Sequence, residues 1–174
     1  RLTVRPSRSQ HFVEGSLTLS CVDDGGSEKW IVWRNTTTGV VSQCGNKWGR
    51  QINSDCINSM ALLLDSGFYW CESSGGAVSS SIQLTVTGGS VILQSPVLPV
   101  MEGDNVTLSC LTKNDVTAPA TFYKDGSLMS TEPADQTTLH QVSRSDGGLY
   151  RCNVRGHGDS PASRLYITDK PRPT

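Results

Sequence analysis

Alternating apolar and hydroxyl side chains form the clearest pattern in the chain, and the pattern occurs twice. A period of two residues places the apolar set on one face of a β-strand. Each copy follows a Glu-Gly turn and ends in a cysteine on the apolar face. The pattern predicts two half-buried strands, whose inward residues are Leu17, Leu19 and Cys21 in the first copy and Val106, Leu108 and Cys110 in the second.

A second pair of matching segments follows each of these strands. Residues 65–71 read Asp-Ser-Gly-Phe-Tyr-Trp-Cys, and residues 146–152 read Asp-Gly-Gly-Leu-Tyr-Arg-Cys. A tyrosine two residues before a cysteine is the arrangement of the tyrosine corner in immunoglobulin-like domains. The repeat therefore predicts two such sandwiches, with inter-sheet disulfides that each contribute about 4 kcal/mol by loop entropy. The expected pairs are Cys21 with Cys71 and Cys110 with Cys152.

The third strand of such a sandwich carries a bulky residue that packs on the disulfide. Phe122 has the right spacing after Cys110 in the second copy. In the first copy the run 30–33, Trp-Ile-Val-Trp, leaves two phases open: Trp30 with Val32 inward, or Ile31 with Trp33 inward. We favour the first phase.

The chain length agrees with two domains, because 174 residues are too many for one sandwich of about 100 residues. We predict an all-β chain of two tandem immunoglobulin-like β-sandwich domains joined by a short elbow at Thr87-Gly88-Gly89-Ser90. The expected boundaries are 1–87 for the first domain, which holds the extra cysteines, 88–168 for the second, and 169–174 for a linker.

Six widely spaced cysteines without a C-x-x-C pair favour disulfides over a zinc site and place the chain in an oxidising compartment. Sequons at Asn35 and Asn105 agree with a glycoprotein on the extracellular side of the plasma membrane, or secreted. No run is apolar enough to span a membrane and no leader precedes the chain, so we expect a trimmed or matured chain whose anchor would lie elsewhere.

Charge and motifs argue against several functions. The net charge is -1 and the charged residues are scattered, which disfavours nucleic acid as a partner. None of the three histidines lies in a nucleophile or metal motif. We predict a protein that is not an enzyme, has no cofactor or metal, is monomeric in solution, and binds another protein.

Cys44 and Cys56 remain after the two inter-sheet pairs are assigned, and we expect them to bridge each other. Their disulfide would close a short loop rich in Gly and Asn, at a gain of roughly 3 kcal/mol. Two roles stay open for this loop. It is either a staple that compensates for missing core, or a preorganised contact loop anchored by Trp48.

With these residues placed, the chain resembles the leukocyte receptors of the immunoglobulin superfamily, above all Fc receptors and fish leukocyte immune-type receptors. The resemblance is most specific over 91–110, which is similar to the start of the second domain of Fc receptors, and it continues in 122–126 and 145–152. The first domain matches more loosely, and its Cys44 and Cys56 suit the fish group. The resemblance implies recognition of immunoglobulin Fc through the second domain and the elbow.

The resemblance also implies which residues touch the ligand. Ser90 stands where Fc receptors have a linker tryptophan, so it removes an aromatic anchor. Binding to class I histocompatibility or class I-like molecules and homophilic adhesion are the alternatives. The candidate contact residues are Arg155, His157 and Asp159 in the loop between the last two strands, Asn114 in an earlier loop, Lys124 and Asp125 in a turn, and Ser90 and Trp48.

Overall fold

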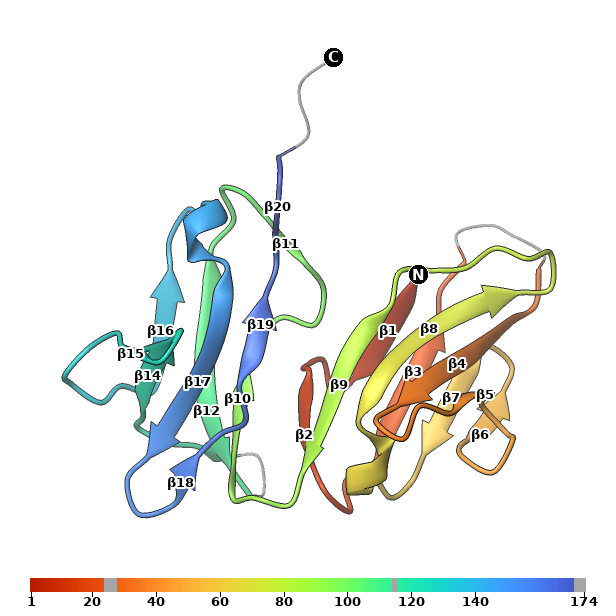
Figure 1. Ribbon diagram of the computed structural model, residues 1–174, viewed down its shortest axis with the longest axis horizontal. Coiled ribbons are helices and arrows are strands. Elements are labelled where there is room, and N and C mark those ends of the chain that lie inside the picture. The colour runs from red at the N-terminus through yellow and green to blue at the C-terminus, as the bar shows by residue number, and fades with distance from the viewer. Residues whose placement is uncertain (24–27, 114–115, 171–174) are drawn as a thin grey trace. The chain divides into compact units, whose positions relative to one another are not determined.

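The structure is a computed structural model that describes residues 1–23, 28–113 and 116–170. It is all-β and divides into two compact units, unit 1 (Arg1–Gly88) and unit 2 (Gly89–Thr174) (Figure 1). The helical elements among the described residues are two single turns of 3-10 helix, η1 (Leu63–Asp65) in unit 1 and η2 (Arg144–Asp146) in unit 2. Each unit is an immunoglobulin-like sandwich of two packed sheet layers.

Unit 1 packs a four-stranded sheet on a five-stranded sheet (Figure 1). The four-stranded sheet has the order β1-β3-β7-β6, and its strands are β1 (Leu2–Arg5), β3 (Leu17–Cys21), β7 (Asp55–Asn58) and β6 (Arg50–Ile52). The five-stranded sheet has the order β2-β9-β8-β4-β5, and its strands are β2 (Gln10–Phe12), β9 (Ile82–Thr87), β8 (Gly67–Ser73), β4 (Trp30–Thr36) and β5 (Val41–Gln43).

The alternation in the sequence fixes which faces of these sheets meet. In β3, Leu17, Leu19 and Cys21 are all buried, as the pattern predicts. In β4 the inward residue is Val32, which is fully buried opposite Cys71, so the favoured phase of this strand is the one observed. Trp30 shares that phase but is only half-buried, and its indole N–H donates to Asp23 Oδ2 at 2.8 Å.

Two disulfides join the sheets of unit 1. Cys21 in β3 pairs with Cys71 in β8. Cys44 directly follows β5 in the five-stranded sheet, and its partner Cys56 lies in β7 of the other sheet. Both cysteines are buried, with exposed fractions of 4% and 0%. The second disulfide is therefore another inter-sheet bridge inside the core, and it also closes the mostly exposed segment between β5 and β7.

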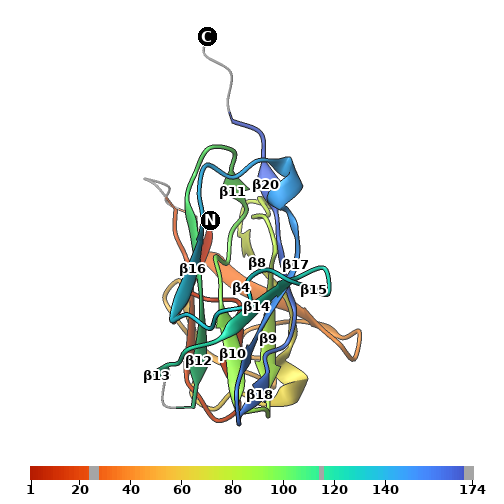
Figure 2. The same ribbon diagram turned by 90° about the vertical axis from the view of Figure 1, so that its left-hand side faces the viewer.

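Unit 2 has the same two-layer plan (Figure 1 and Figure 2). In one layer β12 (Val106–Thr112) pairs with β10 (Val91–Gln94), β13 (Val116–Thr117) and β16 (Gln136–Leu139). The other layer contains β15 (Ser127–Leu128), β14 (Thr121–Lys124), β17 (Gly148–Val154), β18 (Gly158–Asp159) and β19 (Ser163–Leu165). A short parallel pair, β11 (Val100–Met101) with β20 (Ile167–Thr168), completes the unit.

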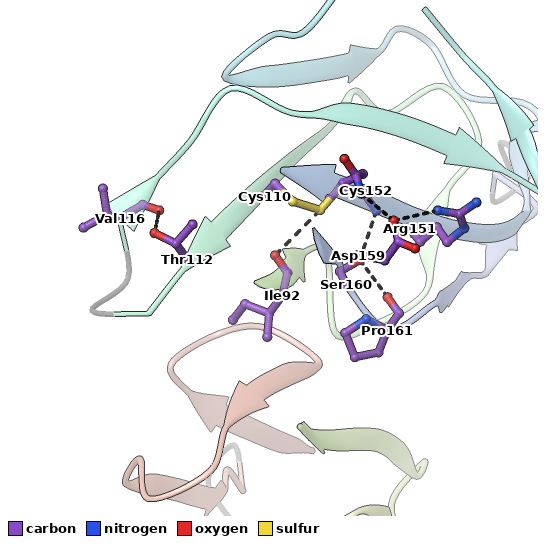
Figure 3. Close-up of a disulfide and its surroundings, with 10 residues drawn as sticks. Ile92, Cys110, Thr112, Val116, Arg151, Cys152, Asp159, Ser160 and Pro161 are labelled. Atoms are coloured by element: carbon purple, nitrogen blue, oxygen red, sulfur yellow. Dashed lines mark hydrogen bonds and ion pairs between the residues drawn. A yellow bond between two sulfur atoms is a disulfide. The ribbon is translucent and has the colours of Figure 1, made fainter. Parts of the chain in front are cut away.

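The core of unit 2 surrounds its disulfide. Cys110 in β12 pairs with Cys152 in β17, and Phe122 lies opposite Cys152 in the neighbouring strand β14. All three side chains belong to one buried apolar cluster. The Cys152 N–H also donates to Ser160 Oγ at 2.9 Å, and that hydroxyl donates to the Pro161 carbonyl (Figure 3). A serine hydroxyl thus satisfies a backbone donor between the part of β17 that pairs with β19 and the part that pairs with β18.

Each unit also has a tyrosine corner. The hydroxyl of Tyr69 donates to the Asp65 carbonyl, and the hydroxyl of Tyr150 donates to the Asp146 carbonyl. Both tyrosine side chains are buried, and the two acceptors end the turns η1 and η2. These bonds attach a 3-10 turn to the strand that carries Cys71 in unit 1 and to the strand that carries Cys152 in unit 2.

Candidate ligand-binding surface

The tip of the hairpin between β17 and β18 presents two of the expected contact residues. Arg155 and His157 are both exposed there, and the turn closes through a bond from the His157 N–H to the Val154 carbonyl at 2.9 Å. Gly156 has a φ of +85°, a conformation that L-residues with side chains rarely adopt. The turn therefore holds the two side chains at the end of unit 2 without covering them.

Asp159 connects this hairpin to the outer face of its sheet. Its Oδ1 accepts from Arg151 Nη1 at 3.1 Å and from Asn153 Nδ2 at 2.8 Å (Figure 3 shows the Arg151 contact). The Arg151 guanidinium also lies 4.0 Å from the centre of the Tyr123 ring. The four residues Tyr123, Arg151, Asn153 and Asp159 form a connected patch that we call the unit 2 patch.

Sequence reasoning missed Tyr123 and Arg151, although a signal was present. Phe122 and Cys152 were both expected to point inward, and successive residues of a strand face opposite sides. Their neighbours Tyr123 and Arg151 must then point outward on adjacent strands. The register pairs these two residues directly, which places the tyrosine and the arginine side by side.

Lys124 and Asp125 lie at the end of β14 that is remote from the hairpin tip. Asp125 and Gly126 form a two-residue turn between β14 and β15, and both have positive φ, as a type I′ hairpin requires. The Asp125 carboxylate accepts from the Leu149 N–H at 2.9 Å, and the Lys124 ammonium donates to the Ser145 carbonyl. Leu149 is near the start of β17 and Arg155 follows its end, about 20 Å farther along the strand. The structure therefore does not bring the turn and the hairpin tip into one site.

Ser90 and Asn114 are two further candidate contact residues. Ser90 is exposed and directly precedes β10, whose Val91 pairs with Thr112 of β12. Asn114 lies outside the described residues. Neither residue belongs to the unit 2 patch.

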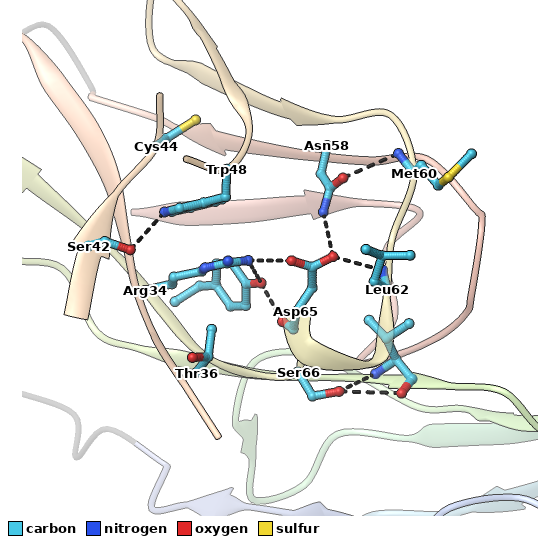
Figure 4. A network of polar contacts seen from close by, with 12 residues as sticks. Arg34, Thr36, Ser42, Cys44, Trp48, Asn58, Met60, Leu62, Asp65 and Ser66 are labelled. Atoms are coloured by element: carbon cyan, nitrogen blue, oxygen red, sulfur yellow. Dashed lines mark hydrogen bonds and ion pairs between the residues drawn. The ribbon is translucent and has the colours of Figure 1, made fainter. Parts of the chain in front are cut away.

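Trp48 is not a surface anchor, and its proposed role as a contact residue is wrong. It is only 9% exposed, and its indole N–H donates to Ser42 Oγ at 3.0 Å (Figure 4). The Arg34 guanidinium lies 4.2 Å from the centre of its ring, and the Tyr69 ring meets it edge-on with centroids 5.8 Å apart. An aromatic side chain buried on all these sides stabilises unit 1 and presents little surface to a partner.

Arg34 and Asp65 form a buried ion pair beside Trp48 (Figure 4). Arg34 Nη1 donates to Asp65 Oδ1 at 2.5 Å and to the Tyr69 hydroxyl at 3.3 Å. The other carboxylate oxygen accepts from Asn58 Nδ2 and from the Leu62 N–H. Burial raises the pKa of the Tyr69 phenol, and the bond from Arg34 offsets part of this shift. This charged network contributes to the fold of unit 1.

The two sequons lie in different environments. Asn105 is exposed, and its Oδ1 accepts from the Gln141 N–H at 2.9 Å. Asn35 lies within β4, between Val41 of β5 and Phe68 of β8 in the register. Across the described parts of the chain, no helix is both long and apolar enough to span a membrane.

Comparison with known proteins agrees with this architecture. Residues 90–168 match the family model described as an immunoglobulin domain. The matched residues make up most of unit 2. The chain is also 34% identical over 117 residues to human Fc receptor-like protein 5, a match that covers 66% of this chain and 12% of that protein.

Two other relatives match longer stretches. The human low affinity immunoglobulin gamma Fc region receptor II-b is 30% identical over 154 residues, which covers 87% of this chain and 47% of the receptor. The mouse basement membrane-specific heparan sulfate proteoglycan core protein is 27% identical over 179 residues, covering 89% of this chain and 5% of that protein. The chain thus spans less than half the length of each of these relatives.

Among solved structures, the N-terminal four immunoglobulin domains of Dscam1 isoform 6.9 align with 98% of this chain and 46% of that chain, at 21% identity and a TM-score of 0.38. A similarity at this level says nothing about function. The sequence matches and the fold together show an immunoglobulin-domain, receptor-like or adhesion-like segment that is similar to Fc receptor-like proteins.

Proposed function

We propose that the chain is the ligand-binding ectodomain of a leukocyte cell-surface receptor and that it recognises immunoglobulin Fc through unit 2. The observation that carries this proposal is the unit 2 patch, which continues into the exposed Arg155 and His157 at the hairpin tip. The similarity to the human low affinity immunoglobulin gamma Fc region receptor II-b supports the choice of ligand. The receptor would act on the extracellular side of the plasma membrane.

The geometry of Arg151 suits a binding role. Stacking on Tyr123 and pairing with Asp159 restrict the guanidinium before a ligand arrives, so less side-chain entropy is lost on binding. The Arg151 side chain is still 33% exposed and Asp159 is 57% exposed. Arginine and tyrosine are enriched among residues that dominate protein–protein binding energy. We therefore assign the main contact to the Arg151–Tyr123 pair, with Arg155, His157 and Asp159 around it.

The receptor group forms a finer part of the proposal. The Cys44–Cys56 bridge in the core of unit 1 supports placing the protein with the fish leukocyte immune-type receptors, which the sequence resembles at these two cysteines. Determining which residues contact immunoglobulin does not depend on this placement, because the contact lies on unit 2.

Equilibrium binding to immobilised, purified immunoglobulin tests the proposal. We expect saturable binding that Arg151→Ala weakens at least about tenfold, which corresponds to about 1.4 kcal/mol. Arg164→Ala is the matched control: Arg164 is exposed on the same sheet, but it pairs with Leu149, toward the other end of β17. The control should bind as the wild type does.

Other outcomes would redirect the proposal. If the wild type and Arg151→Ala bind immunoglobulin with equal affinity, the unit 2 patch is not part of the binding site. If neither binds, Fc is not the ligand. Binding to class I histocompatibility molecules instead would favour the class I alternative. Self-association of the free protein, measured by analytical ultracentrifugation, would favour homophilic adhesion.

A further inference from the structure

The five-stranded sheet of unit 1 presents an apolar outer face. Because Val32 and Arg34 point inward in β4, the intervening residues point outward. Register then places their cross-strand partners on the same face. We define the unit 1 outer face by these residues: Ile31, Trp33 and Asn35 of β4, Val41 and Gln43 of β5, and Phe68, Trp70 and Glu72 of β8.

Several of these side chains are accessible to solvent. Phe68 is 46% exposed and Val41 is 54% exposed. Trp33 and Trp70 are directly opposite each other, and both are half-buried. The next outward residue of β8 is Glu72, whose carboxylate accepts from the Trp70 indole N–H at 3.0 Å. Glu72 is the charged side chain of this face, and exposed apolar patches of this kind mark interaction sites or aggregation liabilities.

Asn35 is the polar residue in the middle of this face. Val41 and Phe68 are its direct neighbours on the two adjacent strands, at a typical Cβ separation of about 5 Å. Trp33 is two residues away on the same side of the strand, about 7 Å along it. A group attached to the Asn35 side chain therefore begins among these three apolar residues.

The local geometry leaves Asn35 open to modification. The sequence Asn35-Thr36-Thr37 is an N-glycosylation acceptor. Asn35 is half-buried, and its Oδ1 is buried without a hydrogen-bond partner. Thr37, whose hydroxyl completes the acceptor, is exposed just beyond the end of β4.

We propose that Asn35 carries an N-linked glycan whose first sugars cover Trp33, Val41 and Phe68 on the unit 1 outer face. Sugar rings have C–H faces that can pack on aromatic side chains, and their hydroxyls remain in water. The glycan is bulky and solubilising, so it replaces an exposed apolar patch with a hydrated surface. The covered face is then closed to other proteins, including a second copy of this chain. This proposal concerns unit 1 and does not depend on Fc binding by unit 2.

The test compares two sequon variants of the chain secreted from eukaryotic cells. Thr37→Ala removes the acceptor but retains Asn35 and every residue of the outer face. Thr107→Ala removes the sequon of Asn105 in unit 2 and is the matched control. Glycan occupancy is measured by mass spectrometry of the peptide that contains Asn35. Coverage is measured by acrylamide quenching of tryptophan fluorescence.

We expect the Asn35 peptide of the wild type to be glycosylated. The quenching constant of Thr37→Ala should be roughly 1.5-fold higher than that of the wild type, because two of the four tryptophans, Trp33 and Trp70, lie on the uncovered face. Thr107→Ala should quench as the wild type does.

Either of two results would overturn the proposal: an unmodified Asn35 in the secreted wild type, or equal quenching constants for wild type and Thr37→Ala. If Thr37→Ala is not secreted, quenching is compared on the folded wild type before and after enzymatic release of its glycans. An unchanged constant in that experiment would also overturn the proposal.

Discussion

The buried ion pair of unit 1 should make Asp65 the most sensitive charged position of that unit. Asp65→Asn keeps the size of the side chain but removes its charge and one of its two acceptor oxygens. Arg34 would remain buried, with a side-chain exposure of 8%, opposite a neutral amide. Removing one partner of a buried pair costs about 3–5 kcal/mol, because the other charge is left uncompensated. That is a large part of the 5–15 kcal/mol that stabilises a typical domain.

Tryptophan fluorescence isolates this effect. All four tryptophans of the chain, Trp30, Trp33, Trp48 and Trp70, lie in unit 1. Urea unfolding followed by their fluorescence therefore reports on unit 1 alone. With a slope of about 1–2 kcal/mol per M, a loss of about 4 kcal/mol lowers the midpoint by roughly 2–4 M.

Asp146→Asn is the matched control, since Asp146 ends the equivalent turn of unit 2. Its carboxylate accepts from the Ser143 N–H at 2.8 Å and forms no ion pair with a buried arginine within the described residues. We expect this variant to leave the tryptophan transition unchanged. A loss below about 1 kcal/mol for Asp65→Asn would refute the reasoning, because it would be no larger than the loss of one neutral hydrogen bond.

Three further predictions concern the core and the tyrosine corner. Gly49→Ala should lower the urea midpoint of unit 1 by more than Gly45→Ala does. Both glycines have positive φ, which costs about 1–2 kcal/mol for a residue with a side chain. Of the two, only a Cβ on Gly49 would also meet the sulfurs of Cys56 and Cys44, at 2.7 and 2.8 Å. Replacing both Cys44 and Cys56 by Ala should cost unit 1 about 3 kcal/mol, because the bridge closes a loop with a sequence separation of 12; an unchanged tryptophan transition would contradict this. Burial, with the nearby carboxylates of Asp146 and Asp125, raises the pKa of Tyr150 to about 12. The unfolded phenol ionises near pH 10, so the stability of unit 2 should fall as the pH rises from about 10 to about 12. If ultraviolet absorbance shows that Tyr150 of the folded protein ionises near pH 10, this prediction is wrong.

The sequence determined most of the fold through local periodicity. A period of two residues is a property of the backbone, so the alternation at Leu17, Leu19 and Cys21 was enough to orient β3 and to identify the cysteine that points inward. The recurrence of tyrosine two residues before cysteine then indicated two sandwiches. The same rule, applied to Phe122 and Cys152, already implied that Tyr123 and Arg151 face outward.

What the sequence alone did not decide was which side chains from distant segments meet. The spacing of Cys44 and Cys56 fits a surface loop equally well. Only the pairing of β7 with β3 shows that their bridge crosses between the sheets, and only the tertiary structure places the Trp48 ring against the Arg34 guanidinium. The neighbours of Asn35 also depend on the register of three strands. Such contacts arise from the non-local pairing of whole strands, and a sequence pattern within one strand carries no information about its partner.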